Sequence, residues 1–254
     1  GWERPQSLDL VGDLSDDEAS TSPWVRVQLG IDVAQRSFKL ADAQNNGIQY
    51  ESGFRPGYEG IFEFFPMALF SPGTADGLGL RLRLTRHFID TRLAVDELGV
   101  INIPTRQREL SIGAGYMHTL GPFEIGGMVG FESLEFILGE NAIYESSSYS
   151  GFSVLGAARY NISPGVFSLG AHGEVRPGPT IGAAEQETFG VASAFGLAFG
   201  ADARVTFLDH VEITGFYSMC RYSSTFDGTG VHELEAVTGS DVFQHLGARL
   251  SYIH

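Results

Sequence analysis

The sequence contains no apolar run that approaches the roughly 18 residues a transmembrane helix requires, and its mean hydropathy is only +0.01. A membrane barrel stays possible, because only alternate residues of its strands face lipid. The single cysteine, Cys220, excludes an internal disulfide and a multi-cysteine metal site. Cationic residues are scarce, with 16 Lys and Arg against 31 Asp and Glu, and Lys39 is the one lysine. The net charge of −15 argues against nucleic-acid binding, which requires a cationic surface.

Glycine is abundant instead, with 33 residues, and aromatic residues make up 12% of the chain. Glycine disfavours helices and aromatic side chains favour strands, so this composition favours an all-β protein. Residues 1–22 are acidic and polar without a regular period, and we expect them to form an N-terminal tail. After Pro23 the pattern changes to alternation, which predicts one barrel domain over residues 23–254.

Apolar and polar residues alternate along successive segments, as expected for strands whose two faces meet different surroundings. In the first segment Leu29 and Ile31 share one face, whereas Arg26 and Asp32 share the other. Several segments exceed the usual length of globular strands and suit tilted transmembrane strands. The pattern predicts about ten strands, at residues 24–40, 57–70, 78–94, 104–118, 122–136, 148–161, 165–176, 190–208, 211–225 and 242–253.

The connections between these strands alternate in length. Short turns follow the second, fourth, sixth and eighth strands, and longer segments follow the others. An up-and-down antiparallel transmembrane barrel with short periplasmic turns and long outer loops produces this rhythm. An even number of strands then places both termini, including the acidic tail, in the periplasm. A soluble barrel of the lipocalin type, with its apolar face inside, is the alternative that alternation alone permits.

Aromatic residues on the apolar face gather at the short-turn ends of the strands. Amphipathic rings prefer the interface between membrane and water, so one row of rings at one height favours a membrane barrel over a soluble one. The predicted aromatic girdle consists of Phe70, Tyr116, Phe123, Tyr160, Phe167, Phe207 and Tyr252.

The C-terminal segment HLGARLSYIH resembles the terminal strand of bacterial outer-membrane β-barrels. His245, Gly247, Leu250 and Tyr252 stand at the polar, glycine, hydrophobic and aromatic positions of that membrane-insertion signal, although the chain continues for two residues beyond the aromatic. The resemblance implies a place in the outer membrane of a Gram-negative bacterium. It also implies contact with outer-membrane lipid and lipopolysaccharide, and insertion by the barrel-assembly machinery.

If the apolar face meets lipid, the opposite face points into the barrel and carries charges of both signs. Buried charges are costly unless they are paired, and a barrel of about ten strands is narrow. We therefore expect a lumen filled by ion pairs rather than an open, porin-like channel. The expected network consists of Arg26, Asp32, Glu63, Arg81, Arg83, Glu109, Glu124, Glu132, Arg159, His172, Glu174, Arg176, Asp202, Arg204, Glu212 and Arg249, with His245 beside them.

The filled lumen favours a non-enzymatic barrel that acts as a structural or interaction platform, and we assign no catalytic residue, metal ligand or cofactor. A narrow channel for ions or small solutes is one alternative, and a hydrolase at the outer rim is another. Small residues on the apolar face could let two barrels pack closely as a homo-oligomer, by analogy with small residues between membrane helices. These residues are Gly127, Gly156, Ala158, Ala201 and Ala203.

Candidate residues for rim chemistry are few. His232 lies in the last long segment, and His87, near Asp90, is the other candidate in the upper wall, although a satisfied structural histidine is the favoured interpretation there. Asp209 and His210 fall in a short periplasmic turn. Cys220 falls on the lumen face without a base that would activate it. The long segments are acidic, and we expect their carboxylates, including Glu185 and Asp241, to be solvated. The alternative is that they bridge to lipopolysaccharide phosphates through Mg²⁺ or Ca²⁺.

Overall fold

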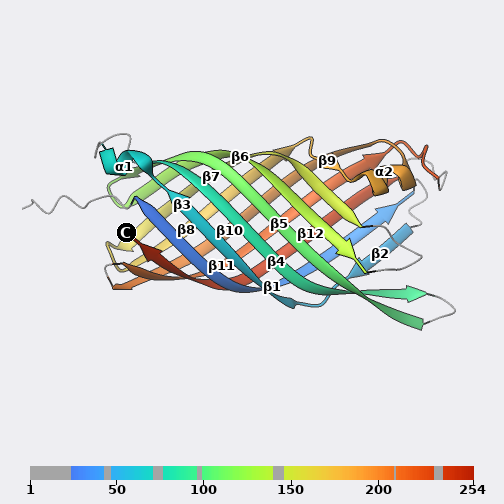
Figure 1. Ribbon diagram of the computed structural model, residues 1–254, viewed down its shortest axis with the longest axis horizontal. Coiled ribbons are helices and arrows are strands. Elements are labelled where there is room, and N and C mark those ends of the chain that lie inside the picture. The colour runs from blue at the N-terminus through green and yellow to red at the C-terminus, as the bar shows by residue number, and fades with distance from the viewer. Residues whose placement is uncertain are drawn as a thin grey trace, which may run out of the picture.

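In the computed structural model, residues 24–42, 47–70, 77–95, 99–139, 146–208, 210–231 and 237–254 are described, and their strands form a closed antiparallel barrel (Figure 1). The predicted tail at residues 1–22 lies outside these ranges. Pairing of the last wall strand with the first closes the barrel, which confirms the up-and-down fold. Ten strands of the described chain form the wall: β1 (Val25–Ala41), β3 (Arg55–Phe64), β4 (Leu78–Val95), β5 (Gly99–Leu120), β6 (Phe123–Leu138), β7 (Ser147–Ser163), β8 (Phe167–Pro177), β10 (Ala192–Leu208), β11 (Val211–Phe226) and β12 (Thr238–Ile253).

Two short strands lengthen the wall at one end. β2 (Gly47–Glu51) pairs with the end of β1 beyond the reach of β3. β9 (Thr180–Ile181) pairs with the start of β7 beyond the reach of β8. Each therefore continues the line of a wall strand after a brief interruption. None of the described helices is long and apolar enough to span a membrane.

The predicted strand at 57–70 ends early. Pro66 has no N–H to donate to a strand pair but suits the first turn of a helix, and residues Pro66–Phe70 form the short helix α1. Phe70 therefore lies in a helix, and its predicted place at the end of a lipid-facing strand is wrong.

The predicted long segment after the strand at 78–94 is also wrong. β4 and β5 pair as far as Val95 and Gly99, so only residues 96–98, outside the described ranges, separate them. Valine and isoleucine at positions 100, 101 and 103 favour strand structure, which extends the hairpin where a loop was expected.

The two ends of the barrel differ. The C-terminus, α1 and the short turns lie at one end, which we call the short-turn end, and α2 (Ala183–Phe189), β2 and β9 lie at the other, the long-loop end (Figure 1). The chain termini of the barrel meet at the short-turn end, where Trp24 N–H donates to the carbonyl of His254 over 2.9 Å. The first strand of the wall thus begins, and the last strand ends, at the short-turn end, as an even number of strands requires.

The two faces of the wall also differ. Apolar side chains point outward, with Leu29 69% and Ile31 74% exposed, whereas Asp32 beside them is 5% exposed. The same alternation repeats around the barrel, because successive side chains of a strand point to opposite faces. A lipocalin-like arrangement would reverse this order, so the structure excludes that alternative.

Candidate functional site: the barrel interior

The interior near the long-loop end is filled by apolar and aromatic side chains, which we call the plug. Phe136 stacks on Phe243 with ring centroids 4.8 Å apart, and Tyr149 stacks on Tyr222 at 4.1 Å. Close packing of this kind leaves little room for water. The plug consists of Leu40, Ile89, Leu134, Phe136, Tyr149, Ile181, Ala194, Cys220, Tyr222, Phe226, Val237 and Phe243.

One buried ion pair lies within the plug. The Arg36 guanidinium donates to both carboxylate oxygens of Asp241, over 2.8 and 2.6 Å, and to the hydroxyl of Ser147 over 2.8 Å. The same guanidinium lies over the ring of Phe136, 3.7 Å from its centroid. Asp241 was expected to be a solvated loop carboxylate. That expectation is wrong, because β12 begins at Thr238 and turns Asp241 inward.

Helix α2 contributes a second buried carboxyl to this end. Glu185 is only 6% exposed, and burial raises its pKa from 4.5 to about 8. Phe189 at the end of α2 packs against Phe226 of the plug, with ring centroids 5.5 Å apart. Glu185 was therefore wrongly expected to be solvated, because the segment that carries it folds against the barrel.

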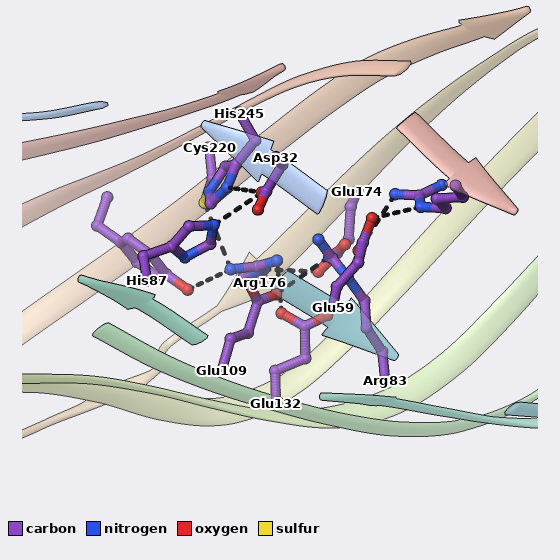
Figure 2. Close-up of polar contacts among 12 residues, drawn as sticks. Asp32, Glu59, Arg83, His87, Glu109, Glu132, Glu174, Arg176, Cys220 and His245 are labelled. Atoms are coloured by element: carbon purple, nitrogen blue, oxygen red, sulfur yellow. Dashed lines mark hydrogen bonds and ion pairs between the residues drawn. The ribbon is translucent and has the colours of Figure 1, made fainter. Parts of the chain in front are cut away.

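Below the plug, ion pairs cross the barrel at mid-height (Figure 2). Arg83 lies between Glu59 and Glu109, with N···O distances of 3.2 Å to each. Arg249 makes a second ion pair with Glu59. The charges of these four residues cancel, because two arginines face two glutamates.

A second group at mid-height is centred on Arg176. Its guanidinium contacts Glu132 at 2.5 Å and Glu174 at 2.6 Å (Figure 2). It also donates to the hydroxyl of Tyr222. It also lies 3.3 Å from the sulfur of Cys220, which is buried. Arg176 thus links the ionic layer to the lower edge of the plug.

The short-turn half of the interior holds a cavity of about 210 Å³, which we call the chamber. Arg26 pairs with Glu63 at 3.5 Å, and Arg159 pairs with Asp202 at 2.8 Å. Arg81 lies 3.8 Å from Glu63 and is 26% exposed, so its charge stays partly hydrated. The chamber walls also include apolar groups such as those of Met128 and Leu155.

The structure places every residue of the predicted lumen network inside the barrel. Among the described residues, all of them except His172 take part in an ion pair or, for Asp32, in hydrogen bonds with histidines. His172 lines the chamber. Sequence reasoning did not predict the apolar plug that occupies the long-loop half of the interior. Sequence reasoning omitted Glu59 and Arg36 from the network, although both stand at lumen-facing positions of their strands.

A third feature at mid-height is a cluster of two histidines and an aspartate. Oδ2 of Asp32 lies 2.7 Å from Nε2 of His87 and 3.3 Å from Nδ1 of His245 (Figure 2). The two imidazole centroids are 4.9 Å apart, and all three residues are buried. We call these residues the Asp–His–His cluster. His87 is fully buried and hydrogen-bonded, which agrees with the structural histidine that the sequence favoured over a catalytic one.

The predicted girdle residues on the strands point outward near the short-turn end. Tyr116, Tyr160 and Tyr252 are exposed, and Phe123 contacts Tyr160 with ring centroids 4.9 Å apart. Phe207 is also exposed, and Phe167 is half-buried. Trp24, which sequence reasoning did not include, packs against Phe64 at the same end.

The remaining candidates are the residues of the insertion signal and those of the turns and long segments. Leu250 and Tyr252 of the insertion signal face outward, whereas His245 faces inward and Gly247 pairs with Asp32. His210 is exposed in a short turn, where its ring lies 6.1 Å from that of Tyr252. Asp209 and His232 lie outside the described residues. A role of the C-terminal insertion signal in assembly of the barrel stays a prediction.

No family model and no curated protein matches the sequence. Among solved structures, the chain is similar to the outer membrane protease OmpT from Escherichia coli, with 6% sequence identity and a TM-score of 0.57, over 91% of this chain and 96% of that chain. It also matches the outer membrane protein OprG from Pseudomonas aeruginosa, with 10% identity and a TM-score of 0.39, over 91% and 97% of the two chains. A third match is a Pseudomonas aeruginosa FadL homologue, with 9% identity and a TM-score of 0.37, over 90% of each chain.

The closed barrel, its apolar outer wall and the similarity of its fold to OmpT define the class of the protein. It has the fold of a bacterial outer-membrane β-barrel, as the resemblance of the terminal strand implied. The outer wall of exposed leucine, isoleucine and phenylalanine requires lipid around it, because an apolar surface of this extent is unfavourable in water. The protein is therefore a bacterial outer-membrane protein.

Proposed function

We propose that the protein is a closed, non-conducting barrel that acts in the outer membrane as a non-enzymatic structural or interaction platform. The observation that carries this proposal is the plug, in which Phe136 and Phe243 are 0% and 1% exposed. A continuous water path through the barrel would have to cross these stacked rings. The buried ion pair of Arg36 and Asp241 strengthens the barrier, because its charges are compensated internally and offer no site to a passing ion.

The alternative of a narrow channel is tested by recording from single barrels in planar lipid bilayers. The wild type is expected to show no conductance steps over a range of voltages, because the plug spans the lumen. Steps in the wild type, lost when the protein is digested or omitted, would contradict the proposal.

A pair of matched variants tests whether the plug is the barrier. Phe136→Ala with Phe243→Ala removes two stacked rings from the plug, and this variant is expected to conduct. The control, Phe131→Ala with Phe152→Ala, removes two rings that contact each other on the outer wall, with centroids 6.1 Å apart. The control is expected to stay silent, because its lumen is unchanged.

Self-association is the second part of the proposal. Gly127 and Gly156 are paired across β6 and β7, and Ala158, Ala201 and Ala203 continue the small outward-facing positions over β7 and β10. A wall without large side chains lets a second barrel approach closely, with lipid and lipopolysaccharide covering the rest. Native mass spectrometry in mild detergent is expected to show a dimer or larger species. A single monomer peak under these conditions would remove this part and leave the closed barrel untouched.

A further inference from the structure

The Asp–His–His cluster is assembled by the closing seam of the barrel. Asp32 lies on β1, His245 on β12 and His87 on β4, so three strands that are distant in sequence supply one group each. β1 and β12 are the first and last strands of the wall, and their pairing closes it. A ligand held by the cluster would therefore join both ends of the sheet.

Two glycines make room for the three side chains. In the strand register Asp32 pairs with Gly57 of β3 on one side and with Gly247 of β12 on the other, and Gly57 pairs in turn with His87. A Cβ at Gly57 would overlap the His87 ring, and a Cβ at Gly247 would lie 2.5 Å from that of Asp32. The two glycines therefore leave the wall without a side chain at the positions where the aspartate and the histidine approach each other.

The donor atoms suit a divalent transition metal. Two imidazole nitrogens and a carboxylate oxygen are ligands of Zn²⁺ and related ions, whereas Ca²⁺ and Mg²⁺ prefer oxygen alone. Ligand bonds of about 2.0–2.1 Å in a tetrahedral site separate the ligand atoms by about 3.3 Å. The observed separations from Asp32 Oδ2 are 2.7 and 3.3 Å, and the candidate ligand atoms all lie within 4.8 Å of one another. Shifts of the ligand atoms by up to about 1.5 Å relative to one another would complete this geometry.

A bound cation would also compensate the negative charge of the buried Asp32 carboxylate. The neighbouring acids Glu59 and Glu109 are offset by Arg83 and Arg249, which leaves the buried Asp32 carboxylate without an arginine partner among the described residues. Its second oxygen, Oδ1, is buried without a hydrogen-bond partner in the same part of the chain. An uncompensated buried carboxylate is unfavourable. A divalent ion would compensate it, as would a proton on one imidazole.

The cluster borders a small cavity that lies next to the chamber. A second cavity of about 40 Å³ borders His245, and its lining shares Arg83, His172, Glu174 and Ser218 with the chamber. One water needs about 10–15 Å³ of such space, so the second cavity has room for solvent. From these observations we propose that Asp32, His87 and His245 form a binding site for one divalent transition-metal ion of the Zn²⁺ type inside the barrel, fastening β12 to β1 and β4.

The test is metal uptake by the full-length barrel in detergent. The protein is stripped with a chelator, loaded with Co²⁺ as a probe for Zn²⁺, desalted and measured by elemental analysis and by visible absorption of the bound cobalt. We expect one Co²⁺ per chain in the wild type. Asp32→Asn, His87→Gln and His245→Gln, which keep polar groups in place, are each expected to weaken binding by more than about 100-fold, because outer-shell partners alone contribute about 10–100-fold.

The matched controls are His172→Gln, in the chamber, and His118→Gln, exposed on β5, and both are expected to keep the cobalt. A wild type that holds no cobalt after desalting overturns the proposal and favours a protonated, hydrogen-bonded cluster. Cobalt that remains in the cluster variants, or that is lost from a control, overturns it as well. If the cluster variants do not fold, X-ray absorption of the Zn²⁺-loaded wild type decides, since two imidazole ligands are required.

Discussion

The plug and the chamber are built on the same ten strands, but they hold their charges in different ways. Arg36 in the plug is 3% exposed and contacts Asp241 at 2.6 Å, whereas Arg81 in the chamber is 26% exposed and lies 3.8 Å from Glu63. In the plug, apolar packing excludes water, so the ion pair of Arg36 and Asp241 has to be complete. In the chamber, water can solvate what the ion pairs leave unmatched. The comparison shows two ways to fill one lumen. Apolar packing excludes water at the long-loop end, whereas water and ion pairs together stabilise the charges at the short-turn end.

The largest expected effect comes from removing one partner of the plug's ion pair. Asp241→Ala removes the carboxylate that the buried Arg36 guanidinium contacts at 2.6 Å, and we expect it to cost about 3–5 kcal/mol of unfolding free energy. Asp202→Ala is the matched change in the chamber, where Arg159 is 14% exposed and keeps its contact with Glu124. There we expect a loss of about 1 kcal/mol, as for partly hydrated pairs. Urea unfolding in detergent or lipid vesicles measures both.

Equal losses in these two variants would show that the plug is no drier than the chamber, and the comparison between them would fail. Asp241→Asn offers a milder form of the same test if the alanine variant does not fold. It keeps a hydrogen-bond acceptor for Arg36 and removes only the charge.

A smaller difference in unfolding free energy is expected when a leucine side chain of the plug or of the chamber is shortened to alanine. Leu134 is 3% exposed within the plug, so Leu134→Ala leaves a cavity and is expected to cost about 2–4 kcal/mol. Leu155 already borders the chamber, so Leu155→Ala enlarges an existing space and is expected to cost about 1 kcal/mol. The same unfolding measurement compares them. A larger loss for Leu155→Ala would place the tighter packing at the short-turn end instead.

Much of this fold could be predicted from alternation alone. The predicted strands and the observed ones coincide within a few residues over most of the wall, because side chains that face lipid and lumen must alternate. The lumen charges follow from the same parity: once Leu29 faces lipid, Asp32 and its equivalents face inward. Alternation placed Phe70 wrongly in a strand, because Pro66 ends the strand before it. That is an effect of backbone chemistry rather than of side-chain pattern.

The plug and the Asp–His–His cluster could not be predicted as well, for different reasons. Phe136 stands at a lumen-facing position, two strand periods after Glu132, but an apolar residue there breaks the alternation and resembles a lipid-facing one. The cluster requires the strand register, since Asp32, His87 and His245 come together only when β1 pairs with β3 and β12. Alternation specifies the face of a side chain but not its height in the barrel.

The smallest expected effect concerns α2, which covers part of the plug. Because the folded-state pKa of Glu185 is raised from 4.5 to about 8, the folded form binds a proton that the unfolded form releases. The contribution of Glu185 to docking is therefore fully present below pH 4.5 and is lost as the pH rises through about 8. A helix of this length can undock locally before the barrel unfolds, so we expect global stability to change by less than about 1 kcal/mol.

Hydrogen exchange of residues 183–189 measures this local step directly. Protection is expected to fall between about pH 4.5 and pH 8, after correction for the intrinsic exchange rate, while protection of the plug strands stays constant. Glu185→Gln is neutral at every pH and is expected to abolish the dependence, whereas Glu187→Gln, on the same helix, is expected to retain it. If α2 loses protection equally in both variants, ionisation of Glu185 is not what undocks the helix. The plug would then exclude water through the barrel strands alone.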